Sequence, residues 1–234
     1  MASIMNMQHL LDNPVWHALN GPQAAWAIGR GQARRYRGEY APFAALETGS
    51  SEAYADLAAD LPPGAEARLM RPAPDPLPPG WEHLEDLTLV QMLAADPPSM
   101  PDTGADDLVE LDRDDDAQIQ ELVASTQPGP FAARTPELGT YLGVREHGRL
   151  IAMAGERIRL PGYVEISAVC TAPQARGRGL AARLVRALQS RAAARGEQAF
   201  LHVRGNNPMA QALYERLGFS VRTELKILRR RPAA

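Results

Sequence analysis

The sequence predicts a protein of the α/β class whose sheet is mixed, as in α+β folds. A smaller N-terminal α+β domain (residues 1–105) is expected to precede a larger α/β domain (residues 106–234). The chain has 234 residues, of which 45% are hydrophobic and 23% are charged, so it is long enough to bury a substantial core. Three prolines lie within residues 96–104, where neither a helix nor a central strand could continue, and we place the domain boundary there. Beyond this boundary strand-like and helix-like patterns alternate regularly, which is typical of an α/β domain.

The N-terminal part is expected to hold short helices and strands, and it carries no chemical motif. Residues 52–61 are predicted to form a helix, because Tyr54, Leu57 and Leu61 fall on one face at helical spacing. The other elements expected here are a helix over 15–19 and strands over 69–71 and 87–93.

The C-terminal part is expected to alternate between strands and helices along its whole length. Gly148 marks a hairpin turn between two strands, and Gly196 ends a long amphipathic helix. Asn207 is a favourable N-cap and Pro208 a favourable first helical residue, so another helix begins there and ends at Gly218. The expected elements are strands over 107–111, 140–145, 150–160, 163–171 and 199–204, helices over 112–124, 179–194 and 207–217, and one or two strands over 219–228.

Composition excludes several classes of function. Cys170 is the only cysteine, which excludes an intramolecular disulfide and a zinc site built on several thiolates, and we expect no metal. The net charge of −3 does not favour a nucleic-acid partner. The sequence shows neither a secretory signal nor an apolar run of ~18 residues, so we expect a cytoplasmic protein without a membrane partner. From Cys170 onward there are 13 basic and 3 acidic residues, which suits an anionic, phosphate-bearing ligand.

A glycine-rich segment between an expected strand and an expected helix is the best candidate for a binding site. Residues 176–182 read Arg-Gly-Arg-Gly-Leu-Ala-Ala, so two glycines allow a ligand to approach the backbone closely. The N–H groups and the positive dipole at the helix start would bind an anion. The Gly-x-Gly-x-x-Ala spacing also fits a dinucleotide-binding fingerprint, but the chain that follows is too short for such a fold. No Gly-Lys-Ser/Thr follows the loop, which excludes a Walker A motif.

Two ordered motifs give the C-terminal part a resemblance to a known family. Residues 169–181, Val-Cys-Thr-Ala-Pro-Gln-Ala-Arg-Gly-Arg-Gly-Leu-Ala, resemble the acetyl-CoA-binding motif of the GNAT superfamily of N-acetyltransferases. Residues 207–219 are similar to the second signature of that family, Asn-x-x-Ala-x-x-Leu-Tyr-x-x-x-Gly-Phe. The resemblance covers residues 107–231. Residues 1–105 more faintly resemble the degenerate extra domain of two-part members such as glycine acyltransferase-like proteins.

The resemblance implies roles for individual residues, with acetyl-CoA as the cosubstrate. The strand before the loop would splay from its neighbour and pair with the pantetheine arm, while an N–H near Cys170 polarises the thioester carbonyl. The N–H groups of residues 177–182 would hold the pyrophosphate, and Tyr214 would donate a proton to the leaving thiolate. The residues implied in cofactor binding are Val169, Cys170, Thr171, Arg176, Gly177, Arg178, Gly179, Leu180, Ala181, Ala182, Asn207 and Tyr214.

The general base is open between three alternatives. Alternation along residues 163–171 would put Glu165 on the face of Val169 and Thr171, and a glutamate at the matching place acts as base in some members of the family. His202 lies where other members carry a glutamate base, and a neutral imidazole would suit that role near pH 7. The third alternative is a water chain or an amine that is already neutral. Either side chain could instead be structural, Glu165 in a salt bridge and His202 as a hydrogen-bonded residue of the sheet.

The implied reaction is direct transfer of an acetyl group from acetyl-CoA to a primary amine of a small molecule or peptide, within a ternary complex. Cys170 is not expected to act as a nucleophile, because direct transfer needs no acyl-enzyme and the residue alternates with apolar neighbours. The alternative from a different class is a sensor or scaffold that binds acyl-CoA without turnover. The sequence indicates neither the acceptor nor the oligomeric state.

Overall fold

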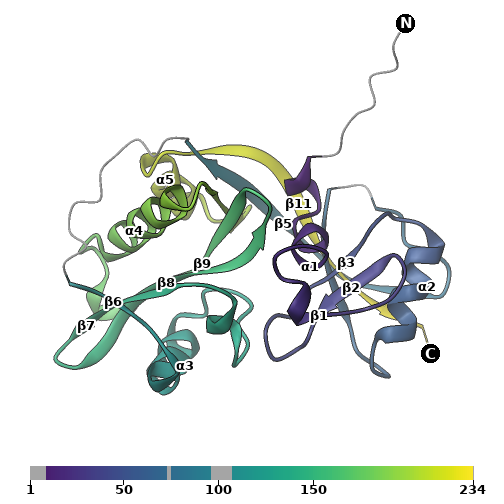
Figure 1. The fold of residues 1–234 in the computed structure, drawn as a ribbon, viewed down its shortest axis with the longest axis horizontal. Coiled ribbons are helices and arrows are strands. Elements are labelled where there is room, and N and C mark those ends of the chain that lie inside the picture. The colour runs from purple at the N-terminus through teal and green to yellow at the C-terminus, as the bar shows by residue number, and fades with distance from the viewer. Residues whose placement is uncertain (1–8, 73–74, 96–106, 234) are drawn as a thin grey trace, which may run out of the picture.

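The computed structural model describes residues 9–72, 75–95 and 107–233, and its strands form one mixed sheet (Figure 1). Within the described residues this sheet has 11 strands in the order β1-β2-β3-β4-β11-β5-β10-β9-β8-β7-β6. The strands are β1 (Ala27–Ile28), β2 (Ala33–Tyr36), β3 (Ala44–Leu46), β4 (Ala67–Arg71), β5 (Trp81–Ala94), β6 (Leu108–Glu110), β7 (Tyr141–Glu146), β8 (Arg149–Leu160), β9 (Tyr163–Thr171), β10 (Gln198–Arg204) and β11 (Phe219–Pro232).

Helices cover both faces of the C-terminal part of the sheet. Helix α4 packs on β8, β9 and β10, and α3 packs on β8 and β9. Figure 1 shows α4 and α5 on one side of these strands and α3 on the other. The α-helices are α1 (Pro14–Leu19), α2 (Ser51–Asp60), α3 (Asp116–Thr126), α4 (Leu180–Ala194) and α5 (Pro208–Arg216). The 3-10 helices are η1 (Leu10–Asp12), η2 (Ala24–Trp26), η3 (Arg113–Asp115), η4 (Thr135–Leu138) and η5 (Pro173–Ala175).

The predicted α/β class with a mixed sheet is confirmed, and the long elements of the C-terminal part lie within a few residues of their predicted places. The predicted helix over 112–124 is observed as η3 followed by α3, with the carboxylate of Asp112 accepting from the N–H of Asp114 at its start. The sequence does not predict β1, β2 or β3, because at two to four residues they are too short for alternation to be visible.

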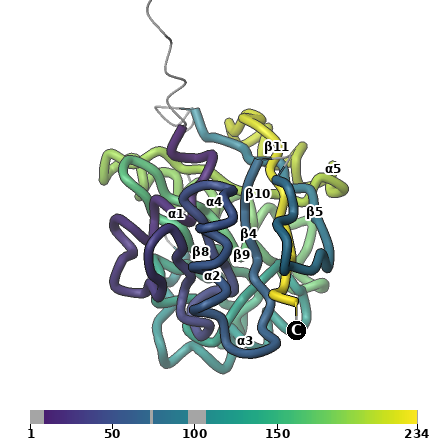
Figure 2. Tube along the Cα trace, turned by 90° about the vertical axis from the view of Figure 1, so that its right-hand side faces the viewer, coloured from purple at the N-terminus to yellow at the C-terminus, as the bar shows by residue number. Residues whose placement is uncertain are grey.

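Strands β5 and β11 join the two parts of the chain at the centre of the sheet. They run side by side and antiparallel along nearly their whole length (Figure 2). The other edge of β5 pairs with β10, and the other edge of β11 pairs with β4. The predicted boundary near residue 105 lies outside the described residues, so the division into two domains stays a prediction. The structure adds that β5, which precedes this boundary, lies between two strands that follow it.

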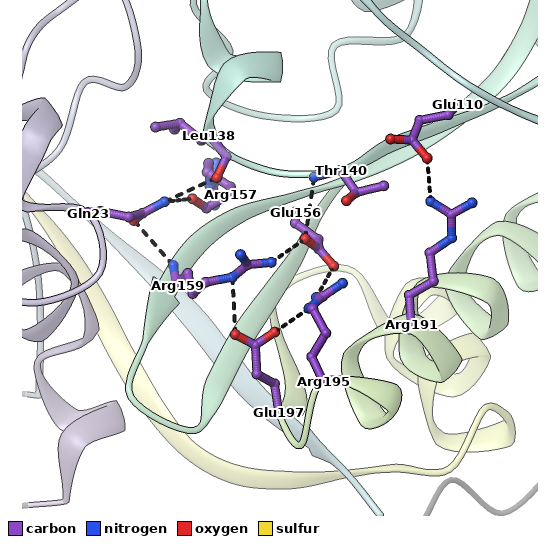
Figure 3. Close-up of polar contacts among 10 residues, drawn as sticks. All are labelled: Gln23, Glu110, Leu138, Thr140, Glu156, Arg157, Arg159, Arg191, Arg195 and Glu197. Carbon is purple, nitrogen blue, oxygen red and sulfur yellow. Dashed lines mark hydrogen bonds and ion pairs between the residues drawn. The ribbon is translucent and has the colours of Figure 1, made fainter.

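Apolar packing and one buried amide hold the N-terminal part against β8. Leu11, Val15 and Leu19 belong to the same apolar cluster as Ile158. The side chain of Gln23 is buried too, and Figure 3 shows its contacts with β8 and with Leu138, the last residue of η4. Its Nε2 donates to the carbonyls of Arg157 (2.7 Å) and Leu138 (3.4 Å), while its Oε1 accepts from the hydroxyl of Tyr36 (2.5 Å) and the N–H of Arg159 (3.2 Å).

A buried glutamate ties the C-terminal end of α4 to β8. Glu156 accepts from Arg159 at 2.8 Å and from Arg195 at 2.5 Å, and both arginines also bind Glu197 (Figure 3). Arg195 directly follows the last residue of α4, so this network fixes where the helix ends on the sheet.

Candidate active site

Strands β9 and β10 separate after a short parallel contact. Their pairing covers three residue pairs and ends at Glu165 and Phe200. From Ile166 and Leu201 onward the two strands have no ladder pairing with each other, although each remains paired on its other side. The edge of β9 that faces β10 is therefore free to pair with an extended ligand, as the family resemblance implies.

A bulge in β9 overturns the strict alternation expected for this strand. Ser167 pairs with Gly155, but Cys170 pairs with Met153, so β9 has one extra residue between these two pairs. Ala168 takes up the extra length at φ +52°, in the left-handed region that an L residue occupies at a cost of about 1–2 kcal/mol. Beyond the bulge, each side chain of β9 lies on the face of the sheet opposite to the one that strict alternation would give it. Glu165 thus shares its face with Ser167 and Cys170, not with Val169 and Thr171.

The glycine-rich loop leads from the separated end of β9 into α4. Gly177 and Gly179 have φ values of +78° and +73°, and an added Cβ at either position would meet nothing within 4 Å. No side chain caps the start of α4, which leaves the first N–H groups of the helix without a side-chain acceptor. Arg178 lies in the loop and binds Glu146 at 2.8 Å, while Arg176 is exposed beside it. An open, positively polarised helix start of this kind fits the phosphate groups of acetyl-CoA.

The second predicted motif lies on α5. Asn207 caps this helix, since its Oδ1 accepts from the N–H of Ala210 at 3.1 Å, which confirms the predicted N-cap. Burial raises the pKa of Tyr214 to about 12, so its hydroxyl keeps its proton at neutral pH. The ring packs edge-on against Phe219 at 6.0 Å. Contact of Asn207 or Tyr214 with a cofactor stays a prediction.

Glu165 forms a buried ion pair with Arg157 and also contacts His202. Arg157 donates to both of its carboxylate oxygens, from Nε to Oε2 at 2.9 Å and from Nη2 to Oε1 at 2.8 Å. His202 Nδ1 lies 2.8 Å from Oε1. Burial alone would raise the pKa of Glu165, but the charge of Arg157 and the hydrogen bond with His202 outweigh it and lower the pKa to about 2. The guanidinium of Arg157 also lies 4.9 Å from the ring centre of Phe43 in the N-terminal part.

His202 lies between Gln91 and Glu165 in a row of hydrogen bonds that begins at the carbonyl of Leu11. The two ends of this row determine which atoms donate. At one end a carbonyl, that of Leu11, accepts from Gln91 Nε2 at 2.9 Å, so the amide nitrogen of Gln91 is the atom that faces it. The same nitrogen lies 3.0 Å from His202 Nε2, which must therefore accept. At the other end the Glu165 carboxylate can only accept, so His202 donates to it from Nδ1.

Neither predicted base is exposed to a substrate in this arrangement. The side chains of Glu165 and His202 are 1% and 3% exposed. Both oxygens of Glu165 accept from Arg157, and both ring nitrogens of His202 are in hydrogen bonds. Cys170 is buried as well, and burial raises the pKa of its thiol to about 11, so at neutral pH it is not a thiolate.

The structure thus brings the predicted loop, the open edge of β9 and the start of α5 to one end of the sheet. It also brings Glu165 and His202 into contact, where β9 and β10 separate. Sequence reasoning missed Arg157 and Gln91, the partners that close this pair. Arg157 carries a signal that could have been used, because a charge within a strand of buried apolar residues needs a partner. Gln91 carries no such signal, since its contact with His202 depends on how β5 and β10 pair.

The described residues contain no group of three or more His, Cys, Asp or Glu side chains placed to hold a metal ion. Across the same ranges, no helix is both long and apolar enough to span a bilayer.

The fold and the loop define the class of the protein as an α/β acyltransferase, and comparisons with known proteins agree. A family profile described as FR47-like protein matches residues 141–227. A crystal structure assigned to the GNAT family of acetyltransferases, from Novosphingobium aromaticivorans, is 41% identical, with a TM-score of 0.86 over 97% of this chain and all of that chain. The chain therefore belongs to the GNAT family of N-acetyltransferases.

Two further relatives match a smaller part of the chain. The N-alpha-acetyltransferase RimI of Mycobacterium tuberculosis is 37% identical over 106 residues, which is 42% of this chain and 66%, just under two thirds, of that relative. A GNAT acetyltransferase structure from Colwellia psychrerythraea is 16% identical, with a TM-score of 0.52 over 63% of this chain and 57% of that one. This second likeness concerns the fold alone.

Proposed function

We propose that this protein transfers an acetyl group from acetyl-CoA to a primary amine by direct attack in a ternary complex. The observation that carries the proposal is the end of the β9–β10 pairing at Glu165 and Phe200, beyond which the free edge of β9 leads to the open loop at the start of α4. Together they offer a strand edge for the pantetheine arm and a positive helix end for the phosphates. Acetyl-CoA supplies the activated acyl group as a thioester.

In the reaction the amine nitrogen bonds to the thioester carbonyl carbon, the carbon–sulfur bond breaks, and the amine gives up a proton. Backbone N–H groups at the bulge around Ala168–Cys170 bind the carbonyl oxygen as negative charge develops on it. Tyr214 donates a proton to the departing thiolate, since its hydroxyl is still protonated at neutral pH.

The amine loses its proton to water, or arrives neutral, and neither Glu165 nor His202 takes that proton. This choice among the three alternatives is supported by their contacts, because each is buried and its acceptor atoms are already in hydrogen bonds. In this proposal Glu165 and His202 have a structural role. Their hydrogen bond holds β9 to β10 next to the point where the two strands separate.

The experiment that tests the proposal is a screen of amines with acetyl-CoA, read by release of the free thiol of CoA. Peptides with a free α-amino group head the panel, because the Mycobacterium tuberculosis relative is named as an N-alpha-acetyltransferase. Amine-dependent thiol release and an acetylated product support the transferase. The absence of an available base also favours a second candidate, an acyl-CoA sensor. That candidate predicts a higher melting temperature with acetyl-CoA and no thiol release with any amine.

A further inference from the structure

The two parts of the chain repeat one order of helices and strands. The N-terminal part runs η1, α1, η2, β1, β2, β3, α2, β4 and β5. The C-terminal part runs η3, α3, η4, β7, β8, β9, α4, β10 and β11, and in the described residues it adds only β6, η5 and α5. The shared order indicates that the two parts are repeats of one structural unit.

The strand pairing repeats as well. β2 and β3 are antiparallel and β3 and β4 are parallel, just as β8 and β9 are antiparallel and β9 and β10 are parallel. The last strands of the two parts, β5 and β11, pair with each other, and they also pair with β10 and β4, respectively. Apart from β6 at one edge, the sheet therefore reads the same from either side of the β5–β11 pair. Figure 1 shows one part on each side of these two strands.

In the N-terminal repeat, the place that corresponds to the candidate cofactor site lies between β3, β4 and the start of α2. The parallel pairing of β3 with β4 covers a single pair, Ala44 with Leu69, so these strands separate at least as early as β9 and β10 do. The chain then passes through residues 47–50, Glu-Thr-Gly-Ser, into α2, as the glycine-rich loop passes into α4. A strand edge, a loop and a helix start thus recur in the same order.

Side chains of the protein itself cover the separated edge of β3. Phe43 and Glu47 form backbone hydrogen bonds on the β2 side, so by alternation the carbonyl of Leu46 points away from β2, toward β4. Arg71, the last residue of β4, donates to this carbonyl from Nη1 at 3.1 Å. The side-chain amide of Asn13 donates to the same carbonyl at 2.7 Å. The strand edge that would pair with an extended ligand is therefore occupied.

A carboxylate lies beside the loop that leads into α2. Oδ1 of Asp75 would be 2.7 Å from a Cβ added at Gly49, so it lies directly against the loop. Arg71 Nε is 3.3 Å from this oxygen, while Tyr54 of α2 donates to Oδ2 at 2.7 Å and Arg230 Nη1 lies 3.8 Å from Oδ2. The side chains of Asp75 and Arg230 are 5% and 4% exposed. Two guanidinium groups thus surround one carboxylate, and buried charges of this kind require an anion between them.

We propose that the N-terminal part is a closed repeat of the acyl-CoA-binding unit. The Asp75 carboxylate occupies the position of a phosphate, and the Arg71 side chain occupies the position of the pantetheine arm. The protein therefore binds one acyl-CoA per chain, at α4. The described residues of the N-terminal part also contain no counterpart of α5, which carries Tyr214. The inference rests on the proposed function only for what the corresponding place at α4 binds.

The test is the variant Asp75→Ala, which removes the carboxylate and opens its place beside Arg71 and Arg230. The two guanidinium groups lose their counter-charge, so the variant is expected to melt at a lower temperature than the wild type. Inorganic phosphate is then titrated in as the probe. At about tenfold excess over its dissociation constant, phosphate is expected to raise the melting temperature of Asp75→Ala by about 3–6 °C more than that of the wild type.

The matched control is Asp75→Asn, which removes the same charge but keeps the place filled. It is expected to melt at a lower temperature than the wild type as well, and to respond to phosphate as the wild type does. Equal responses of Asp75→Ala and Asp75→Asn overturn the inference, because the place beside the two arginines would then not accept an external anion.

A second measurement needs no variant of the N-terminal part. Calorimetric titration of the wild type with acetyl-CoA is expected to give one site per chain, and Gly179→Asp is expected to give none. A site that survives in Gly179→Asp, or a second site in the wild type, overturns the inference. If acetyl-CoA does not bind at all while phosphate stabilises Asp75→Ala, the proposed function fails and the anion place in the N-terminal part stands.

Discussion

Tyr214 is the residue on which the proposed chemistry depends most directly. Burial raises its pKa to about 12, so its hydroxyl still carries a proton at neutral pH that it can deliver to a thiolate. Replacement by phenylalanine keeps the packing against Phe219. We expect Tyr214→Phe to lower kcat by about 10²-fold, in line with general acid contributions, with little change in the dissociation constant of acetyl-CoA.

The measurement is a steady-state thiol assay beside a thermal shift with acetyl-CoA. Tyr163→Phe serves as the control, because Tyr163 lies at the opposite end of β9 and its hydroxyl is exposed near His9. Tyr214→Phe with wild-type turnover would make this tyrosine a packing residue only.

Glu165 is expected to matter more for stability than for proton transfer. Glu165→Gln leaves the buried Arg157 without its counter-charge, and removing one partner of a buried pair costs about 3–5 kcal/mol. Urea unfolding should show a loss of this size. Glu146→Gln is the control, because its partner Arg178 is exposed and such surface pairs contribute little to stability. Equal stability of the two variants contradicts the expectation.

The same carboxylate gives the protein a defined sensitivity to acid. Its pKa falls from 4.5 in the unfolded chain to about 2 in the folded protein, so the folded state binds the proton less tightly. The stabilisation is therefore complete above pH 4.5 and is lost as the pH falls toward 2, with a total of about 3 kcal/mol. The stability difference between wild type and Glu165→Gln should narrow as urea unfolding is repeated from pH 6 down to pH 3. A constant difference contradicts this linkage.

At the residue scale the sequence predicts the loop and the two motifs well, because glycines, an N-cap and a helix start are local signals. It fails on the orientation of Glu165. The bulge that exchanges the faces of β9 is carried by Ala168, and alanine at a positive φ has no signature in a single sequence. The pairing of Glu165 with Arg157 follows from how two bulged strands meet, which alternation alone does not reveal.

At the scale of elements, the N-terminal end of α4 is the feature that can be tested most cleanly. Gly179 lies at φ +73° with open space around it, in the loop where phosphate is proposed to bind, and Gly196 lies at φ +72° with open space just beyond the other end of the helix. We expect Gly179→Asp to abolish the rise in melting temperature with acetyl-CoA, because it adds a side chain and a negative charge beside the phosphates.

The control is Gly196→Asp, which introduces the same residue at nearly the same backbone angle. It should lower the melting temperature of the free protein by a similar amount and leave the response to acetyl-CoA intact. A response that survives in Gly179→Asp would move the phosphate site away from α4.

The elements of the C-terminal part are predictable because they are long. Helices α3 and α4 and strands β8 and β9 span nine residues or more, so their periodicity stands out from the background. The N-terminal strands β1 to β3 owe their existence to pairing with each other and to β4, and not to any pattern of their own.

At the scale of the whole molecule, β5 makes the two parts of the chain dependent on each other. Its residues Val90, Met92 and Ala94 belong to the core of the C-terminal part, and without it β10 and β11 have no common neighbour. We expect a fragment of residues 107–234 to be unfolded or aggregated and not to bind acetyl-CoA. Circular dichroism and thermal shift measure this directly.

The control is co-expression of that fragment with residues 1–106, which supplies β5 in trans and should restore acetyl-CoA binding. Cooperative unfolding and a cofactor response of the 107–234 fragment alone would instead establish an independent C-terminal domain. The sequence predicts a boundary at the proline-rich segment, since composition is local. It does not predict that a strand before the segment is paired with strands more than 100 residues later, because no local pattern records the partner of a strand.

The central place of β5 has a consequence for how the protein is made on the ribosome. β5 is complete at residue 94, but β10 begins at residue 198 and β11 ends at residue 232. At ~5–20 residues per second, the nascent chain therefore carries β5 for about 5–20 s before β10 has even been synthesised. During this interval its backbone edges and the apolar side chains of Val90 and Met92 are exposed to other nascent chains and to chaperones. The yield of active protein should thus depend on the speed of synthesis and on the supply of chaperones.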